Sequence, residues 1–152
     1  MEKPRLEKYP ATAESPAKIN RLMIGDKHVG VSYVQYFSRP FPHYYLGYVG
    51  TATDEREKGY GRMLMDEFES KLLATGRAGV LNDMLAYHNG VGSPLLGMYE
   101  RRGWQRIPHT SVLTFNLPPG VGAEDLRKLV AVRKQQFART SKSNQSNRAG
   151  PK

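Results

Sequence analysis

The sequence predicts an α/β protein of the α+β kind, because β-like runs stand before, between and after amphipathic helical segments. The clearest unit spans residues 44–76, where an aromatic, β-prone run, a glycine turn and a helical pattern follow one another. No internal repeat is evident, and a chain of 152 residues can bury one sizeable core. We therefore expect one compact domain.

The N-terminal third predicts an arm and then two paired strands. Residues 1–17 are rich in Pro, Lys, Glu and Ala without a sustained period, which indicates an extended arm. The β-like runs 19–24 and 28–37 are joined by Gly25-Asp26-Lys27, a connection typical of a hairpin. Two prolines make residues 38–43 a loop, because proline cannot donate a hydrogen bond within a central strand.

A long helix follows the aromatic strand that begins at Tyr44. Its apolar side is expected to hold the residues that recur at helical spacing: Gly61, Leu64, Met65, Phe68, Leu72 and Leu73. Gly76 is expected to end this helix, since glycine readily adopts the left-handed conformation of a C-terminal cap. Residues 79–85 then predict a strand, and residues 87–92 a loop.

The C-terminal part predicts a short helix, two strands and a last helix. Ser93 suits an N-cap, Pro94 the first helical position, and Gly103 the end of the short helix. The elements after it are expected at 104–107 (strand), 111–117 (strand) and 123–138 (helix, with Glu124 and Asp125 in its first turn), followed by a polar, disordered stretch at 140–152. The organisation we expect is an arm at 1–17, a domain at 18–118, and a basic helix with its tail at 119–152.

The stretch Arg56-Glu57-Lys58-Gly59-Tyr60-Gly61-Arg62 stands between a strand and a helix. Two glycines allow the backbone to approach an anion closely, so that successive N–H groups can point at phosphate oxygens. The start of the following helix adds a favourable dipole. The sequence therefore predicts a pyrophosphate-binding loop, and the alternative is an ordinary surface turn.

A second motif, Met98-Tyr99-Glu100-Arg101-Arg102-Gly103-Trp104, closes the short helix. Together, Arg-x-x-Gly-x-Gly and Tyr-Glu-x-x-Gly-aromatic resemble the GCN5-related N-acetyltransferase (GNAT) family over roughly residues 19–117. The resemblance implies a mixed, mostly antiparallel central sheet flanked by helices, and acetyl-CoA as the acetyl donor. It also implies that main-chain amides of residues 58–62 hold the CoA pyrophosphate and that Tyr99 is the general acid beside the cofactor sulfur.

The chemistry of Tyr99 is consistent with that role. A phenol with an ordinary pKa near 10 is protonated at neutral pH and can give its proton to a departing thiolate. The alternative for Tyr99 is a half-buried helix tyrosine that packs beside Trp104. Along the preceding strand, main-chain amides from Val49 to Thr51 are expected to polarise the thioester carbonyl. With Arg56 and Asn89 added, the expected cofactor-binding set is Val49, Thr51, Arg56, Lys58, Gly59, Tyr60, Gly61, Arg62 and Asn89.

Two departures from the family pattern matter. Little sequence precedes Ile19, where the family usually has helices that cover the acceptor site, so the N-terminal region is reduced. The acceptor site is then either unusually open or completed by another subunit, as in a homodimer. The family also often has an asparagine seven residues before its tyrosine, where this chain has Gly92; Asn89 takes that role only if an inserted turn brings it back.

The general base is the least determined residue. An amine acceptor must lose a proton, and a carboxylate or an imidazole can take it. Our candidates are Asp83 on the predicted strand, His88 in the loop after it and His43 before the aromatic strand, although each one alone is more simply a solvated or capping residue. Asp54 and Glu55 are interpreted as turn residues that stabilise the helix start by charge.

Composition excludes several kinds of chemistry. The chain has no cysteine, so we expect neither a thiol nucleophile nor thiolate metal ligands, and direct transfer is the simpler scheme. The four histidines are too scattered to suggest a metal site. No run has the apolar length of a signal peptide core or a membrane helix, so we expect a cytoplasmic protein without membrane contact.

The chain carries a formal net charge of +9, and CoA phosphates account for only part of the expected anionic partner. The basic C-terminal helix and tail are either a solvated, solubilising segment or a non-specific contact for nucleic acid. Aromatic residues on the predicted strands could pack, line an acceptor groove or stack on bases: Tyr33, Tyr36, Phe37, Tyr44, Tyr45 and Tyr48.

Two functions follow from these observations. The first is an N-acetyltransferase that moves an acetyl group from acetyl-CoA directly to an amine. The second is a non-catalytic CoA-binding or nucleic-acid-binding accessory protein on the same fold. The acceptor stays open among small amines, protein amines and nucleic acid amines, although the basic surface favours a macromolecule.

Overall fold

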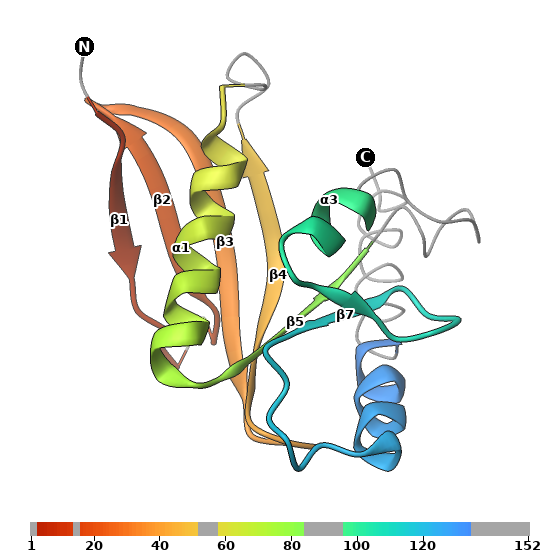
Figure 1. The fold of residues 1–152 in the computed structure, drawn as a ribbon. Helices are drawn as coiled ribbons and strands as arrows, with labels where there is room; N and C mark the ends of the chain where they lie inside the picture. The colour runs from red at the N-terminus through yellow and green to blue at the C-terminus, as the bar shows by residue number, and fades with distance from the viewer. Residues whose placement is uncertain (1–2, 14–15, 52–57, 84–95, 135–152) are drawn as a thin grey trace, which may run out of the picture.

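The computed structural model describes residues 3–13, 16–51, 58–83 and 96–134. These residues form one seven-stranded sheet with the order β1-β2-β3-β4-β5-β7-β6 (Figure 1). Strands β4 and β5 pair in parallel, and every other described pair is antiparallel. The sheet is thus mixed and mostly antiparallel, which confirms the predicted fold class.

The first four strands are β1 (Arg5–Tyr9), β2 (Lys18–Ile24), β3 (Lys27–Phe37) and β4 (His43–Thr51). The hairpin between β2 and β3 is confirmed, and Gly25 adopts a positive φ of 59° in its turn. The prediction of an extended arm was wrong for residues 5–9, which form an edge strand paired with β2. Leu6 is the one apolar residue of β1 that packs against a buried cluster, so no hydrophobic period revealed this strand.

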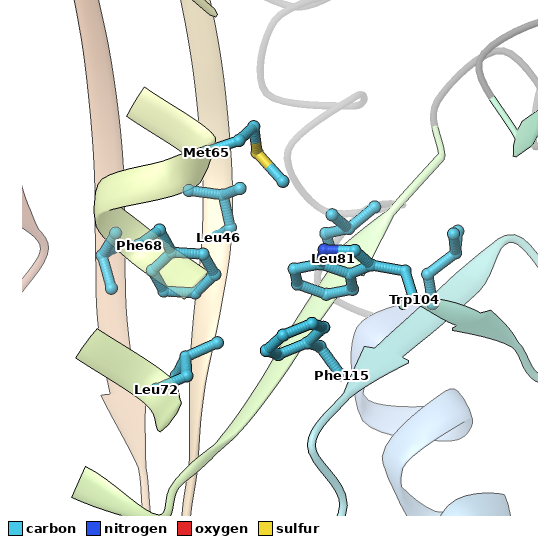
Figure 2. Close-up of a cluster of buried hydrophobic side chains, with 9 residues drawn as sticks. Leu46, Met65, Phe68, Leu72, Leu81, Trp104 and Phe115 are labelled. Carbon is cyan, nitrogen blue, oxygen red and sulfur yellow. The ribbon is translucent and has the colours of Figure 1, made fainter. Parts of the chain in front are cut away.

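Helix α1 (Tyr60–Thr75) lies against one face of the sheet, as predicted. Its residues Met65, Phe68 and Leu72 point at a core that Leu46, Leu81, Trp104 and Phe115 complete (Figure 2). The helix ends at Gly76, which has a φ of 66° and donates its N–H to the carbonyl of Leu72. Leu73, expected on the buried side, is 61% exposed because it lies beyond the edge of the packed stripe.

The second half contains β5 (Ala78–Asn82), α3 (Leu96–Arg101), β6 (Gln105–Arg106) and β7 (Val112–Phe115). The predicted strands at 104–107 and 111–117 exist but are shorter than expected. Gly103, with a φ of 100°, follows α3 as predicted. The loop at 87–92, Ser93 with Pro94, and the polar stretch at 140–152 lie outside the described residues.

Residues 123–134 are helical and cover the opposite face of the sheet. Leu129 is fully buried with Phe41, Val80 and other apolar residues, whereas Leu81 belongs to the core under α1. Since neighbouring residues of a strand point to opposite faces, Val80 and Leu81 place the two cores on either side of β5. The remainder of the expected helix, up to residue 138, lies outside the described residues.

Candidate functional site

A cavity opens where strands β4 and β5 separate. Their parallel pairing ends at Leu46 with Leu81, whereas the antiparallel pairing of β4 with β3 continues to Thr51. The β3–β4 register shifts next to Gly47, a local irregularity that bends a strand. The cavity has a volume of about 740 Å³. Its lining comes from β4, β5, α3 and the start of α1: Leu46, Gly47, Tyr48, Val49, Thr51, Gly59, Tyr60, Gly61, Arg62, Met65, Leu81, Asn82, Asp83, Met98, Tyr99 and Arg102.

The N-terminus of α1 lines this cavity through Gly59, Tyr60, Gly61 and Arg62. Gly59 caps the helix in a left-handed conformation, with a φ of 87°, and, as a glycine, it supplies no side chain that could cap the helix. The first turn contains no acidic residue. The first helix N–H groups have no acceptor within a helix, and the positive end of the dipole adds to them. This end of α1 is therefore suited to an anion.

A second pair of side chains, Tyr99 on α3 and Asp83 after β5, lines the same cavity. Burial raises the pKa of the Tyr99 phenol above its usual value, and the negative charge of Asp83 raises it further. Asp83 is 4% exposed, and its backbone N–H donates to the carbonyl of Ser111 at 2.8 Å. The cavity thus contains a phenol that keeps its proton and a buried carboxyl group.

The position of α3 next to the cavity is fixed by a polar network that sequence reasoning missed. Arg102 Nε donates to Glu69 Oε2 at 2.9 Å, and Trp104 Nε1 donates to the same oxygen at 2.7 Å. Arg102 also pairs with Asp66. The available signal was Glu69 itself, an acidic residue beside the apolar residues Phe68 and Leu72 on the helix. The network connects α1 to the segment that carries Tyr99.

Most of the predicted site residues that are described come together. Those that line the cavity are Val49, Thr51, Gly59, Tyr60, Gly61, Arg62, Asp83 and Tyr99. Lys58 is described but is not among the lining residues. Arg56, His88, Asn89, Asp54 and Glu55 lie outside the described residues.

His43 was wrong as a candidate base. It is fully buried on the face covered by residues 123–134, where its ring lies against Phe37 and Phe41. Its Nδ1 donates to the carbonyl of Phe41 at 2.8 Å, and burial lowers its pKa. A residue enclosed there cannot reach an acceptor amine in the cavity.

Several lining residues were not expected from the sequence: Leu46, Gly47, Tyr48 (considered only as part of the aromatic cluster), Met65, Leu81, Asn82, Met98 and Arg102. Some could have been found by following the period of the strand and helix on which the expected residues lie. The six aromatic residues of the cluster divide between the two sheet faces, since Tyr44 packs under α1 whereas Tyr45 packs with the opposite core. Of the six, only Tyr48 lines this cavity.

The described residues contain no group of three or more His, Cys, Asp or Glu that could hold a metal ion. Within the same part of the chain, we find no helix with the length and apolar character needed to cross a bilayer.

Comparison with known proteins identifies the fold. No family model matches the chain, and no curated protein matches it. Among solved structures, a bacterial toxin shares 9% identity over 76% of this chain and 91% of its own, with a TM-score of 0.56. The PaiA N-acetyltransferase of Thermoplasma acidophilum, in complex with coenzyme A, shares 12% identity over 69% of this chain and 64% of its own, with a TM-score of 0.51.

A third similar structure, the KacTA–DNA complex, shares 17% identity over 65% of this chain and 67% of its own, with a TM-score of 0.50. At these identities the similarity shows the fold. The splayed strands and the helix that starts at the cavity define a protein with the acetyltransferase fold. More particularly, it is the GNAT fold, as the two motifs at Gly59–Gly61 and Tyr99–Trp104 predicted.

Proposed function

We propose that this protein is an N-acetyltransferase that moves an acetyl group from acetyl-CoA directly to an amine. One observation carries the proposal: a helix N-terminus capped by Gly59 and a protonated Tyr99 near Asp83 line one cavity between splayed strands. The coenzyme A bound by the structurally similar PaiA N-acetyltransferase supports the choice of donor.

The residues at the start of α1 fit a pyrophosphate. Among the described residues, a Cβ placed on Gly59 would meet nothing within 4 Å, and one on Gly61 would meet only a Thr51 methyl group at 3.8 Å, so these residues leave space before the amides. We assign the pyrophosphate to the amides of residues 59–62, with Arg62, Lys58 and Arg56 as nearby cations. Asn89 is a further proposed contact.

Main-chain amides between Val49 and Thr51 are proposed to polarise the thioester carbonyl. This part of β4 lines the cavity beyond the last residue that pairs with β5. An amide aimed at an oxygen that gains negative charge lowers the barrier of acyl transfer. The donor supplies the acetyl group as a thioester, and positioning by the splayed strands supplies much of the remaining acceleration.

Proton transfers are assigned to the two buried groups. The amine nitrogen forms a bond to the acetyl carbon, and the carbon–sulfur bond breaks. Tyr99 donates its phenolic proton to the departing sulfur, and Asp83 accepts the proton that the amine loses. His88 is the alternative base.

The acceptor amine is proposed to belong to a macromolecule. Between β1 and β2, the described residues 10–13 and 16–17 contain no helix that could cover an acceptor site. We infer that the acceptor site is either open to solvent on this side or completed by a second subunit. The basic tail at 139–152 is proposed as an accessory contact for nucleic acid, which deletion of that tail would abolish without loss of acetyl transfer.

Donor binding is tested by thermal unfolding with acetyl-CoA, CoA or ATP. Acetyl-CoA at about a hundred times its dissociation constant should add about 2.7 kcal/mol of stability, and ATP should not reproduce this. Gly61→Glu should abolish the effect, because it places a carboxylate before the pyrophosphate. Gly120→Glu, at a glycine with open surroundings, is the matched control. Equal stabilisation of both variants would overturn the assigned donor site.

Turnover is tested by Tyr99→Phe with thiol release as the readout. Loss of a general acid should reduce kcat by about 100-fold or more while the affinity for CoA is kept. Tyr36→Phe, at a tyrosine 45% exposed and outside the cavity, should leave kcat unchanged. A non-catalytic accessory protein would release no thiol above background in either variant or in the wild type.

A further inference from the structure

A second cavity lies between α1 and strands β2 and β3. Its volume is about 260 Å³. Its lining residues place it on the β2–β3 side of α1, whereas the cavity that contains Tyr99 lies on the β4–β5 side. No residue that the structure describes lines both cavities. The lining of the second cavity is Lys18, Asn20, Ser32, Val34, Tyr44, Leu64, Glu67, Phe68, Lys71, Leu72 and Thr75.

Positive charge is in excess around this cavity. Lys71 and Lys8 both pair with one oxygen of Glu67, at 3.5 Å and 3.2 Å. Burial and the neighbouring charges of Lys18 and Lys8 lower the pKa of Lys71 to about 8. Two ammonium groups therefore share one carboxylate, and the third, that of Lys18, lies close to Lys71. An anion bound beside Lys18 and Lys71 would relieve their mutual repulsion.

The interior of the cavity offers an acceptor that has no partner. Asn20 is 6% exposed, and its Nδ2 donates to Ser32 Oγ at 3.2 Å. Its Oδ1 is buried without a hydrogen-bond partner among the described residues. Buried acceptors are nearly always paired, so this oxygen calls for a donor inside the cavity. Apolar side chains of Val34, Leu64 and Phe68 form the wall beside it.

We propose that this cavity binds a small organic acid that carries a hydrogen-bond donor and a short apolar body. The anionic group meets Lys18 and Lys71, the donor meets Asn20 Oδ1, and the apolar body lies against Leu64 and Phe68. Hydroxy acids and amino acids combine these three features. The site is separate from acetyl transfer, because it shares no lining residue with the other cavity.

The test follows the side-chain amide of Asn20 and the backbone amide of Ser32 by nitrogen-15 NMR of the full chain. The probe is 2-hydroxy-4-methylpentanoate. Three comparison compounds each remove one feature: 4-methylpentanoate lacks the hydroxyl group, 4-methylpentane-1,2-diol lacks the charge, and inorganic phosphate lacks the apolar body. We expect the hydroxy acid to shift both signals and each comparison compound to bind at least about 10-fold more weakly.

Two variants test the assigned contacts. Asn20→Ala and Lys71→Met should each lower the affinity for the hydroxy acid by at least about 10-fold. The matched controls Gln35→Ala and Lys128→Met should leave this affinity unchanged. Gln35 lies on the neighbouring strand β3 outside this cavity, and Lys128 is exposed on the helical segment 123–134. The Lys71 side chain lies at the mouth of the cavity and is 42% exposed, so Lys71→Met should fold. It therefore tests the proposal if Asn20→Ala fails to fold.

Three results would each overturn the proposal. The first is that no compound shifts the two signals. The second is that the diol binds as tightly as the hydroxy acid. The third is that phosphate binds as tightly as the hydroxy acid and that Asn20→Ala does not change the affinity. This third result would mean that the anion binds only to exposed lysines. Acetyl-CoA added to the same sample should move signals of Gly61 and Tyr99, so failure at either cavity is seen separately.

Discussion

Glu69 offers the sharpest test of how the candidate site is held together. Its carboxylate accepts hydrogen bonds from Trp104 at 2.7 Å and from Arg102 at 2.9 Å, and the residue is only 9% exposed. Replacement by Ala removes the oxygen that accepts both hydrogen bonds. Trp104 is 1% exposed, so its indole N–H then has no acceptor from Glu69 and is shielded from water.

The cost has two parts. A buried donor left without its partner costs about 1–3 kcal/mol. Arg102 keeps its pair with Asp66 and is not left without a partner, so loss of its hydrogen bond to Glu69 adds about 1 kcal/mol. We expect Glu69→Ala to lower the free energy of unfolding by about 2–4 kcal/mol in total. Glu69→Gln keeps an acceptor for Trp104 and should cost only about 1 kcal/mol.

Urea unfolding followed by fluorescence measures this difference, because Trp104 is the only tryptophan of the chain and reports on its own surroundings. The same variants should lower the thermal midpoint by about 2–4 °C for each kcal/mol. If Glu69→Ala changed the free energy of unfolding by less than about 0.5 kcal/mol, the network would not hold α3 against α1. Equal losses in the Ala and Gln variants would show that the charge, and not the acceptor for Trp104, is what matters.

Three further predictions concern packing and pH. Gly79→Ala should destabilise the fold by about 1–3 kcal/mol in urea, because its Cβ would stand 2.4 Å from a methyl group of Leu72, whereas Gly120→Ala should not. Burial lowers the pKa of His43, so its neutral form stabilises the fold above pH ~6.5, and this contribution is lost on acidification. The difference in free energy of unfolding between the wild type and His43→Gln should therefore shrink as the pH falls from ~7 to ~5. Protonated Lys71, with a pKa of about 8 in the fold, opposes folding at neutral pH. Because the Lys71 side chain is 42% exposed, Lys71→Met should raise the free energy of unfolding by less than about 1 kcal/mol at pH ~7. This gain should fade as the pH rises from ~8 to ~10.5. A variant without any gain at neutral pH would contradict the prediction.

Features encoded by neighbouring residues could be predicted from the sequence. The glycine turn and α1 are local: glycine is required at position 59 by a positive φ, and helical spacing marks the buried stripe. Gly76 ends the helix for the same local reason. Tyr99 was found through a motif on one short helix, and the structure places it on the wall of the same cavity as the glycine turn.

Features that depend on distant pairing could not be predicted. Strand β1 is too polar to show a period, and only its pairing with β2 makes it a strand. His43 and Asp83 looked equivalent as bases because both stand near strand ends. The parallel pairing of β4 with β5 and the helical cover at 123–134 decide between them, since His43 is enclosed on one face and Asp83 lines the cavity.

The cavity between α1 and strands β2 and β3 also depends on distant pairing, so the sequence does not predict it. Asn20 and Ser32 lie on different strands, and Lys71 lies on α1, so no segment of sequence contains the site. On its face of β2, Asn20 lies between Lys18 and the buried Leu22, and its chain neighbours are Ile19 and Arg21, so no apolar period marks the position as buried. A polar residue at a buried strand position is costly unless something pairs with it, and Ser32 satisfies only its amide nitrogen. Among the described residues, Asn20 Oδ1 is thus a buried acceptor without a hydrogen-bond partner that lies on the wall of a cavity, and it is the reason to search for a ligand beside α1 as well as between the splayed strands.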